Sequence, residues 1–163
     1  MIKKVLLLVS LSLSLLATNP VKNGTELKEF NKYKFETPTG RQMKVPKRTE
    51  LIIVAFTKDT GKLANTYLDS KNPYYLSSYH TIFVADIHNM PSFVTTMFAL
   101  PKLREYKHPI YLHYEDEFEN FIPNKDEEII IIRLEDKKVV SVSFITTTAQ
   151  LKDAIEKWTH LKP

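Results

Sequence analysis

The sequence contains no cysteine in its 163 residues. A chain without a thiol cannot form a disulfide framework, a CxxC redox pair, or a Cys-ligated zinc or iron–sulfur centre. Glycine is also scarce, because Gly24, Gly40 and Gly61 are the only three and stand far apart. Loops that cradle phosphate need closely spaced glycines so that backbone N–H groups reach the ligand. The GxGxxG and GxxxxGK[ST] motifs are therefore excluded.

The remaining composition is that of an ordinary folded chain. Hydrophobic residues make up 43% of it and charged residues 26%, which is enough apolar side chain for a real core. At roughly 150 residues per domain, the length predicts one domain with a short appendage.

The first residues have the pattern of a secretory signal peptide. Lys3 and Lys4 precede an uncharged stretch at 5–16, and Thr18-Asn19-Pro20 ends that stretch before the roughly 20 apolar residues that a membrane span needs. We expect cleavage near Ala17, a periplasmic mature protein, and no stable membrane insertion after cleavage. If the leader is retained, the chain is instead a membrane-tethered accessory subunit. The expected division is signal peptide 1–17, linker 18–29 and domain 30–163.

Charge argues against a nucleic-acid partner. Removal of Lys3 and Lys4 lowers the formal net charge from +4 to +2, so the mature chain is only mildly basic. Basic residues are concentrated in 22–48 and acidic residues in 115–128. Both runs are read either as solvated surface or as the two ends of a dipolar molecule that docks a charged partner.

Hydrophobic patterning predicts the strands. Uninterrupted apolar runs at 51–56 and 81–85 are typical of strands buried on both faces, and 110–113 is a third strand. A Pro/Gly turn at 37–40 joins two alternating segments into a hairpin over 33–45. A second hairpin is predicted at 129–134 and 139–145.

Helical spacing and capping residues predict the helices. Asp59 or Thr60 can cap a helix that Pro73 stops, and 74–79 adds a further turn. A helix beginning at Pro91 is expected to turn Phe93, Val94, Met97 and Phe98 toward the core. Residues 115–128 are expected to be mostly loop. A capping box from Thr147 to Gln150 starts the last helix.

The predicted order is hairpin, β, α, β, α, β, hairpin, α. This order gives an α/β fold with a mixed sheet, an N-terminal β-hairpin and helices on both faces. It resembles the thioredoxin-like superfamily, a three-layer sandwich, in its peroxiredoxin-related form. The resemblance covers about residues 30–157 and rests on the order of the elements.

The resemblance implies where a reaction would occur. In redox-active members the active site lies between the first core strand and the next helix, which here is 56–64. A CxxC pair would fall near Gly61 and Ala64, and a peroxidatic TxxC would match Thr57 to Thr60 with a threonine in place of the thiol. Thiol–disulfide exchange and peroxide reduction both need a thiolate, so neither can run in this chain. No catalytic residue carries over.

The same junction remains a candidate binding edge, because ligands in open α/β sheets lie beyond the carboxyl ends of the strands. The candidate residues follow two neighbouring strands: Thr57, Lys58, Asp59, Thr60, Asp86, His88 and Asn89. As an alternative, Asp59 and Asn89 only cap helices and Lys58 is solvated.

Two short motifs raise the question of a metal. Asp86-x-His88 and His113-x-Glu115 end different strands and could converge as a nitrogen and oxygen site suited to zinc or copper(II). A spacing of two residues is weaker than the i, i+4 histidine pair of HExxH, so we expect no metal and no cofactor.

These observations favour an exported, redox-inactive protein that acts by binding, with another exported or envelope protein as its partner. The stretch 86–103 also resembles a group of small exported proteins of unknown role, some of which carry FAD/FMN-type dehydrogenase names. An oxidoreductase component is therefore the alternative, although a flavin domain needs a glycine-rich turn that is missing here. The oligomeric state stays open.

Overall fold

A computed structural model describes residues 19–125 and 127–159 of the chain, so the expected leader at 1–17 lies outside the described residues. Seven strands form one sheet in the order β2-β1-β5-β4-β3-β6-β7. Their bounds are β1 (Phe35–Glu36), β2 (Gln42–Met43), β3 (Leu51–Ala55), β4 (Thr81–Asp86), β5 (Tyr111–His113), β6 (Ile129–Glu135) and β7 (Lys138–Ile145). Both predicted hairpins, the two predicted buried strands and the predicted third strand are present.

The centre of the sheet is parallel and its flanks are antiparallel. β4 pairs in parallel with β3 and with β5, whereas β1–β2, β1–β5, β3–β6 and β6–β7 are antiparallel. The parallel strands are buried along their whole length. This burial explains why their sequences are almost continuously apolar.

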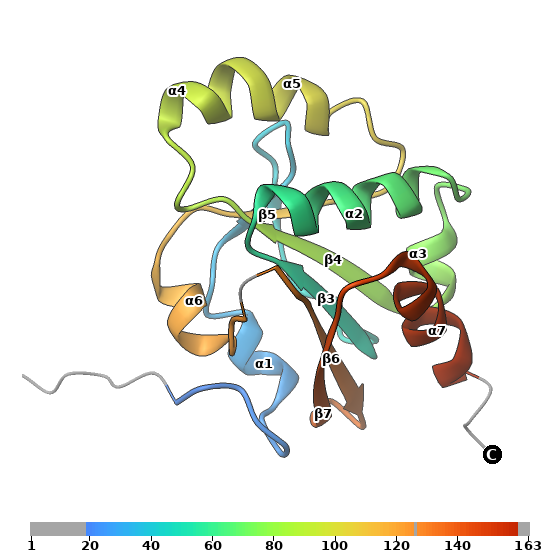
Figure 1. The fold of residues 1–163 in the computed structure, drawn as a ribbon. Coiled ribbons are helices and arrows are strands. Elements are labelled where there is room, and N and C mark those ends of the chain that lie inside the picture. The colour runs from blue at the N-terminus through green and yellow to red at the C-terminus, as the bar shows by residue number, and fades with distance from the viewer. Residues whose placement is uncertain (1–18, 126, 160–163) are drawn as a thin grey trace, which may run out of the picture.

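Helices cover both faces of this sheet, which gives the three layers visible in Figure 1. Their bounds are α1 (Leu27–Phe30), α2 (Lys58–Asp69), α3 (Tyr75–Ser78), α4 (Ser92–Val94), the π-helical turn η1 (Thr95–Ala99), α5 (Leu100–Leu103), α6 (Glu117–Phe121) and α7 (Thr148–Thr159). One apolar cluster packs α2, α3 and α7 on one face, and a second packs α1 and α6 on the other. Among the described residues, no helix is both long and apolar enough to cross a membrane.

The segment before the first strand packs against the domain. Val21, Leu27 and Phe30 are buried, and the Val21 N–H donates to the Phe121 carbonyl at 2.7 Å. Gly24 N–H donates to the Val139 carbonyl at 2.7 Å, so this segment also borders the start of β7. Residues 19–29 thus contribute to the core, although their composition is that of a linker.

The start of α2 differs from the expectation. Its N-cap is Thr57, and neither Asp59 nor Thr60 takes that position. The helix begins at Lys58 and ends at Asp69, ahead of Pro73. Thr57 has an extended backbone and its side chain accepts from the Thr60 N–H, which are the two properties of a helix cap. The capping box of α7 is present as predicted, because the side chains of Thr147 and Gln150 each accept the other's N–H.

The helix after Pro91 was assigned the wrong buried face. Phe93, Met97 and Phe98 are exposed, and only Thr95 of that stretch is buried. The helix is also interrupted, since α4 passes through the π-helical turn η1 into α5. The expectation that 115–128 is mostly loop needs a correction too, because Glu117–Phe121 forms α6. Phe118 and Phe121 of α6 are buried, and this burial stabilises a short helix in an acidic sequence.

Candidate functional site

Three parallel strands end at one edge of the sheet, and a polar segment follows each of them. Asp86, the last residue of β4, is in register with His113, the last residue of β5. Ala55, at the end of β3, is in register with Ala85. The segments beginning at Thr57, at Asp86 and at His113 therefore emerge along the same edge.

Thr57 and Thr60 are hydrogen-bonded to each other at the junction of β3 and α2. The Thr60 N–H donates to Thr57 Oγ1 at 3.2 Å, and the Thr57 N–H donates to Thr60 Oγ1 at 3.1 Å. Their two hydroxyl oxygens lie 2.9 Å apart. This reciprocal pattern is a capping box, so both hydroxyls satisfy the first turn of α2. Thr60 is buried, whereas Lys58 and Asp59 are exposed.

Next along the edge, Asp86 lies between two imidazoles. Asp86 Oδ1 is 2.6 Å from His88 Nδ1, and Asp86 Oδ2 is 3.2 Å from His113 Nδ1. The His88 N–H also donates to Asp86 Oδ1 at 3.0 Å, which fixes the loop after β4. The side chains of Asp86 and His113 are fully buried, and that of His88 is 10% exposed. Buried polar groups are costly unless they are paired, and this pairing compensates for the burial of Asp86.

His113 is enclosed by aromatic rings. Its ring centroid lies 4.9 Å from that of Phe118, 5.7 Å from that of Phe35 and 6.0 Å from that of Tyr33. His113 Nε2 is buried and has no hydrogen-bond partner among the described residues. Desolvation is the largest cause that raises the pKa of Tyr33, to about 12, and Glu117 and Glu29 raise it further. The inner end of the cluster is therefore an apolar, water-poor environment.

Glu119 completes the cluster, although no sequence motif indicated it. Glu119 Oε2 lies 3.2 Å from His88 Nε2, so α6 is connected to the loop after β4. Asp86 and Glu119 thus contact the two different nitrogens of the same imidazole, Nδ1 and Nε2. Glu119 is 31 residues from His88, and no motif links residues at that spacing. Its only sequence signal is that it follows Phe118, an apolar residue in an acidic stretch.

The four residues considered as metal ligands are only partly brought together. Asp86, His88 and His113 are in contact, but the Glu115 carboxylate lies 3.4 Å from Lys34 Nζ. The Glu115 backbone N–H is what faces His113 Nδ1, at 3.4 Å. In the described part of the chain no group of three or more His, Asp or Glu side chains is arranged to hold a metal ion. The two Nδ1 atoms are instead engaged with opposite oxygens of Asp86.

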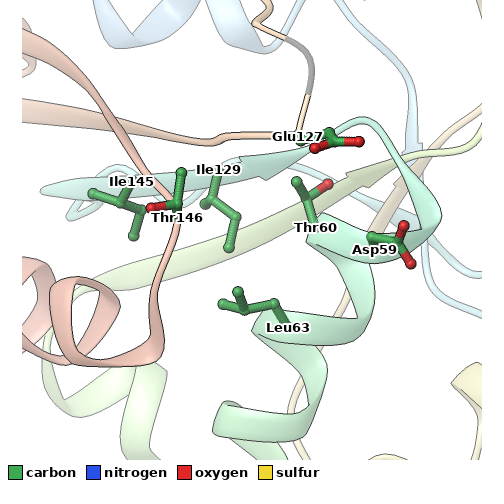
Figure 2. Close-up of a pocket in the computed structure, with 7 residues that line it drawn as sticks. All are labelled: Asp59, Thr60, Leu63, Glu127, Ile129, Ile145 and Thr146. Carbon is green, nitrogen blue, oxygen red and sulfur yellow. The ribbon is translucent and has the colours of Figure 1, made fainter.

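A pocket of about 200 Å³ lies between the start of α2, the start of β6 and the end of β7 (Figure 2). Asp59, Thr60 and Leu63 of α2 line one side, and Glu127 and the residues at the β6 and β7 ends line the other. Of the predicted edge residues, only Asp59 and Thr60 line this pocket. Asp86 and His88 belong to the separate cluster, and Asn89 is exposed.

Comparison with known proteins identifies the fold. No protein-family model and no curated protein sequence matches the chain. Peroxiredoxin Q from Xanthomonas campestris is similar in structure, with a TM-score of 0.54 and 13% identity, covering 88% of this chain and all (100%) of that one. The bacterioferritin comigratory protein of the same organism gives a TM-score of 0.51 and 14% identity, with 87% and 98% covered. StoA from Bacillus subtilis gives a TM-score of 0.51 and 15% identity, with 76% and 96% covered.

The fold is therefore thioredoxin-like, and the resemblance inferred from the order of elements is confirmed. At these identities the likeness establishes the fold alone. The neighbours that are named as peroxiredoxins are redox proteins, whereas this chain has no cysteine with which to perform their reaction. The arrangement at the edge orients the His88 imidazole between the carboxylates of Asp86 and Glu119.

Proposed function

We propose that this protein is an exported, redox-inactive thioredoxin-like domain that binds another exported or envelope protein. The proposed binding surface is the carboxyl edge of β3 and β4, where Lys58, Asp59 and Asn89 are exposed. Ligands of open α/β sheets occupy this edge because the loops there are free to vary while the strands hold their positions.

One observation carries the proposal. Thr57 and Thr60 stand where the resemblance expects the peroxidatic TxxC motif, and their hydroxyls are hydrogen-bonded to each other and to the helix backbone. A hydroxyl engaged in this way caps a helix and is not a substitute for a thiolate. The chain thus has the thioredoxin-like fold but lacks the cysteine that would react. The surface at the carboxyl edge of the strands is still present, which supports a role in binding.

Site-specific photocrosslinking in the producing cell tests the binding surface. A photoreactive amino acid at Lys58 or Asn89 is expected to give an adduct of one defined mass, identified by mass spectrometry. Lys152 of α7 is the matched control, because it is also an exposed helical lysine and is far in sequence from the edge. The proposal would be contradicted if Lys152 gave the same adducts as Lys58, or if neither edge position gave an adduct.

Three measurements separate the alternatives. Cell fractionation should find the protein in the periplasm, and the intact mass of the purified protein should give a first residue near Thr18. A retained leader would favour the tethered accessory subunit. The preparation should be colourless, since flavin absorbance at one equivalent would favour the oxidoreductase component instead.

A further inference from the structure

The segment 92–101 has no charged side chain and yet lies on the surface. Phe93 is 63% exposed, Met97 67% and Phe98 64%. In Figure 1, the helix that runs from α4 to α5 lies at the top of the view, above α2. Single exposed apolar residues are normal, but three large ones within six positions of one helix mark a surface that contacts something apolar.

A π-helical turn lies within this apolar segment. The Leu100 N–H donates to the Thr95 carbonyl, which is a hydrogen bond between residues five apart. The wider turn changes the direction of the side chains that follow it relative to those of α4. Pro101 explains the widened turn, because proline has no N–H to offer the carbonyl four residues earlier and its ring crowds that turn.

The opposite side of this helix is already used by the domain. Leu100 and Leu103 pack against the core cluster that contains α2, and Thr95 is buried with its hydroxyl on the Pro91 carbonyl. The helix is therefore held in place through this side. Phe93, Met97 and Phe98 make no contribution to that packing, so the fold does not require them to be apolar.

Positive charge follows directly after the apolar segment. Lys102, Arg104 and Lys107 are exposed, and Glu105 is the only acidic residue between positions 87 and 114. Glu105 pairs with Lys102 at 2.7 Å, and the Arg104 Nε–H donates to the Pro38 carbonyl at 2.9 Å. The bond to Pro38 holds the β1–β2 turn beside α5, and that turn carries the exposed Arg41. The rim of the apolar surface is thus positive overall.

We propose that the helix formed by α4, η1 and α5 docks on the surface of an anionic lipid bilayer. Phe93, Met97 and Phe98 enter the boundary between headgroups and acyl chains, while the cations at the α5 end face the lipid phosphates. An apolar helix face flanked by lysine and arginine is the pattern of an interfacial helix that lies in the membrane plane.

The charges favour this occupant over a second copy of the chain. A second copy would present the same positive rim, with Glu105 and Asp69 as its nearby acidic groups, whereas an anionic bilayer supplies negative charge all around the apolar side chains. This docking is peripheral, uses other residues than the proposed protein-binding edge, and does not depend on binding there.

Vesicle co-sedimentation tests the proposal. The protein is purified in the form that accumulates in the producing cell, and intact mass establishes its first residue. Vesicles of equal parts phosphatidylglycerol and phosphatidylcholine are compared with vesicles of phosphatidylcholine alone. The triple variant Phe93→Ser/Met97→Ser/Phe98→Ser should bind the anionic vesicles at least about tenfold more weakly than wild type. Replacing Lys102 and Lys107 with alanine should weaken binding about fivefold per cation, and added salt should weaken it further.

The matched control is Tyr74→Ser, which removes an exposed aromatic ring from a different part of the surface. It should bind as wild type does, and the triple variant should keep the wild-type thermal midpoint because its three side chains are exposed. The proposal is overturned if wild type does not sediment with anionic vesicles, if it binds both vesicles equally, or if Tyr74→Ser loses as much binding. Light scattering adds a further outcome. If wild type is a dimer that does not bind vesicles, and the triple variant is a monomer, then the occupant of this surface is a second copy of the chain and the proposal is overturned.

Discussion

His108 is the clearest case of a single side chain whose environment sets its ionisation. His108 Nε2 lies 2.9 Å from Asn65 Oδ1, and Nδ1 is buried without a partner among the described residues. Burial lowers the pKa of His108 from 6.5 to about 4, although Asp69 opposes the shift. The imidazole is therefore neutral in the folded protein at neutral pH.

This environment predicts a loss of stability in mild acid. The unfolded chain binds a proton at His108 as the pH falls below about 6.5, and the folded chain does so only near 4. The free energy of unfolding should therefore fall across this interval, by about 3 kcal/mol in total. Urea unfolding at a series of pH values measures it. His108→Gln should remove most of this slope, and an unchanged slope in that variant would rule His108 out as its source.

Asp86 and Glu119 contact the same imidazole from environments of different exposure. The Asp86 side chain is fully buried and that of Glu119 is 38% exposed. Asp86→Asn should cost about 3 kcal/mol of unfolding free energy, because it leaves two buried imidazoles with a weaker acceptor. Glu119→Gln should cost less than about 1 kcal/mol. Chemical denaturation of both variants checks the order. Equal losses of unfolding free energy in the two variants would mean that the buried Asp86 contributes no more stability than an ion pair on the surface.

At the scale of one element, the start of α2 depends on Thr57. Thr57→Ala removes the acceptor for the Thr60 N–H and should cost about 1 kcal/mol of stability. Thr66→Ala in the middle of the same helix is the matched control, because Thr66 is exposed and alanine favours helix. Thermal unfolding should show a lower midpoint for the first variant only. A lower midpoint for both would assign the effect to α2 as a whole.

The elements also show where local sequence information ends. The apolar run of β3 and the capping box of α7 were predictable, because a long buried strand and a reciprocal cap each have a signature of their own. The buried face of the helix after Pro91 was not. Its apolar residues point to both sides of the helix, and the π-helical turn changes which of them align. Helix α6 was missed because its stability comes from the burial of Phe118 and Phe121.

At the scale of the whole molecule, adjacent residues of β3 support both layers of the core. The side chain of Ile52 belongs to the cluster under α1 and α6, and that of Ile53 to the cluster under α2 and α7. Both residues are completely buried. A single strand therefore connects the two halves of the core.

This connection predicts one cooperative transition. Ile52→Ala and Ile53→Ala should each cost about 2–5 kcal/mol, and each should lower the whole transition without splitting it. Denaturation followed by far-UV and near-UV circular dichroism checks this, with Ser143→Ala on the exposed part of β7 as the control. Separate far-UV and near-UV midpoints in either variant would mean that the two layers unfold independently.

The sequence by itself determined what chemistry is excluded and what kind of fold results. The absence of cysteine removes thiol chemistry whatever the conformation, and the alternation of buried strands with helices restricts the topology to a few solutions. The tertiary structure decided which side chains meet. Asp86 contacts His113 because β4 and β5 pair in register, and Glu119 reaches His88 because α6 folds over the same edge. It also decided that Phe93, Met97 and Phe98 are exposed, because the direction of a side chain depends on the packing around its helix.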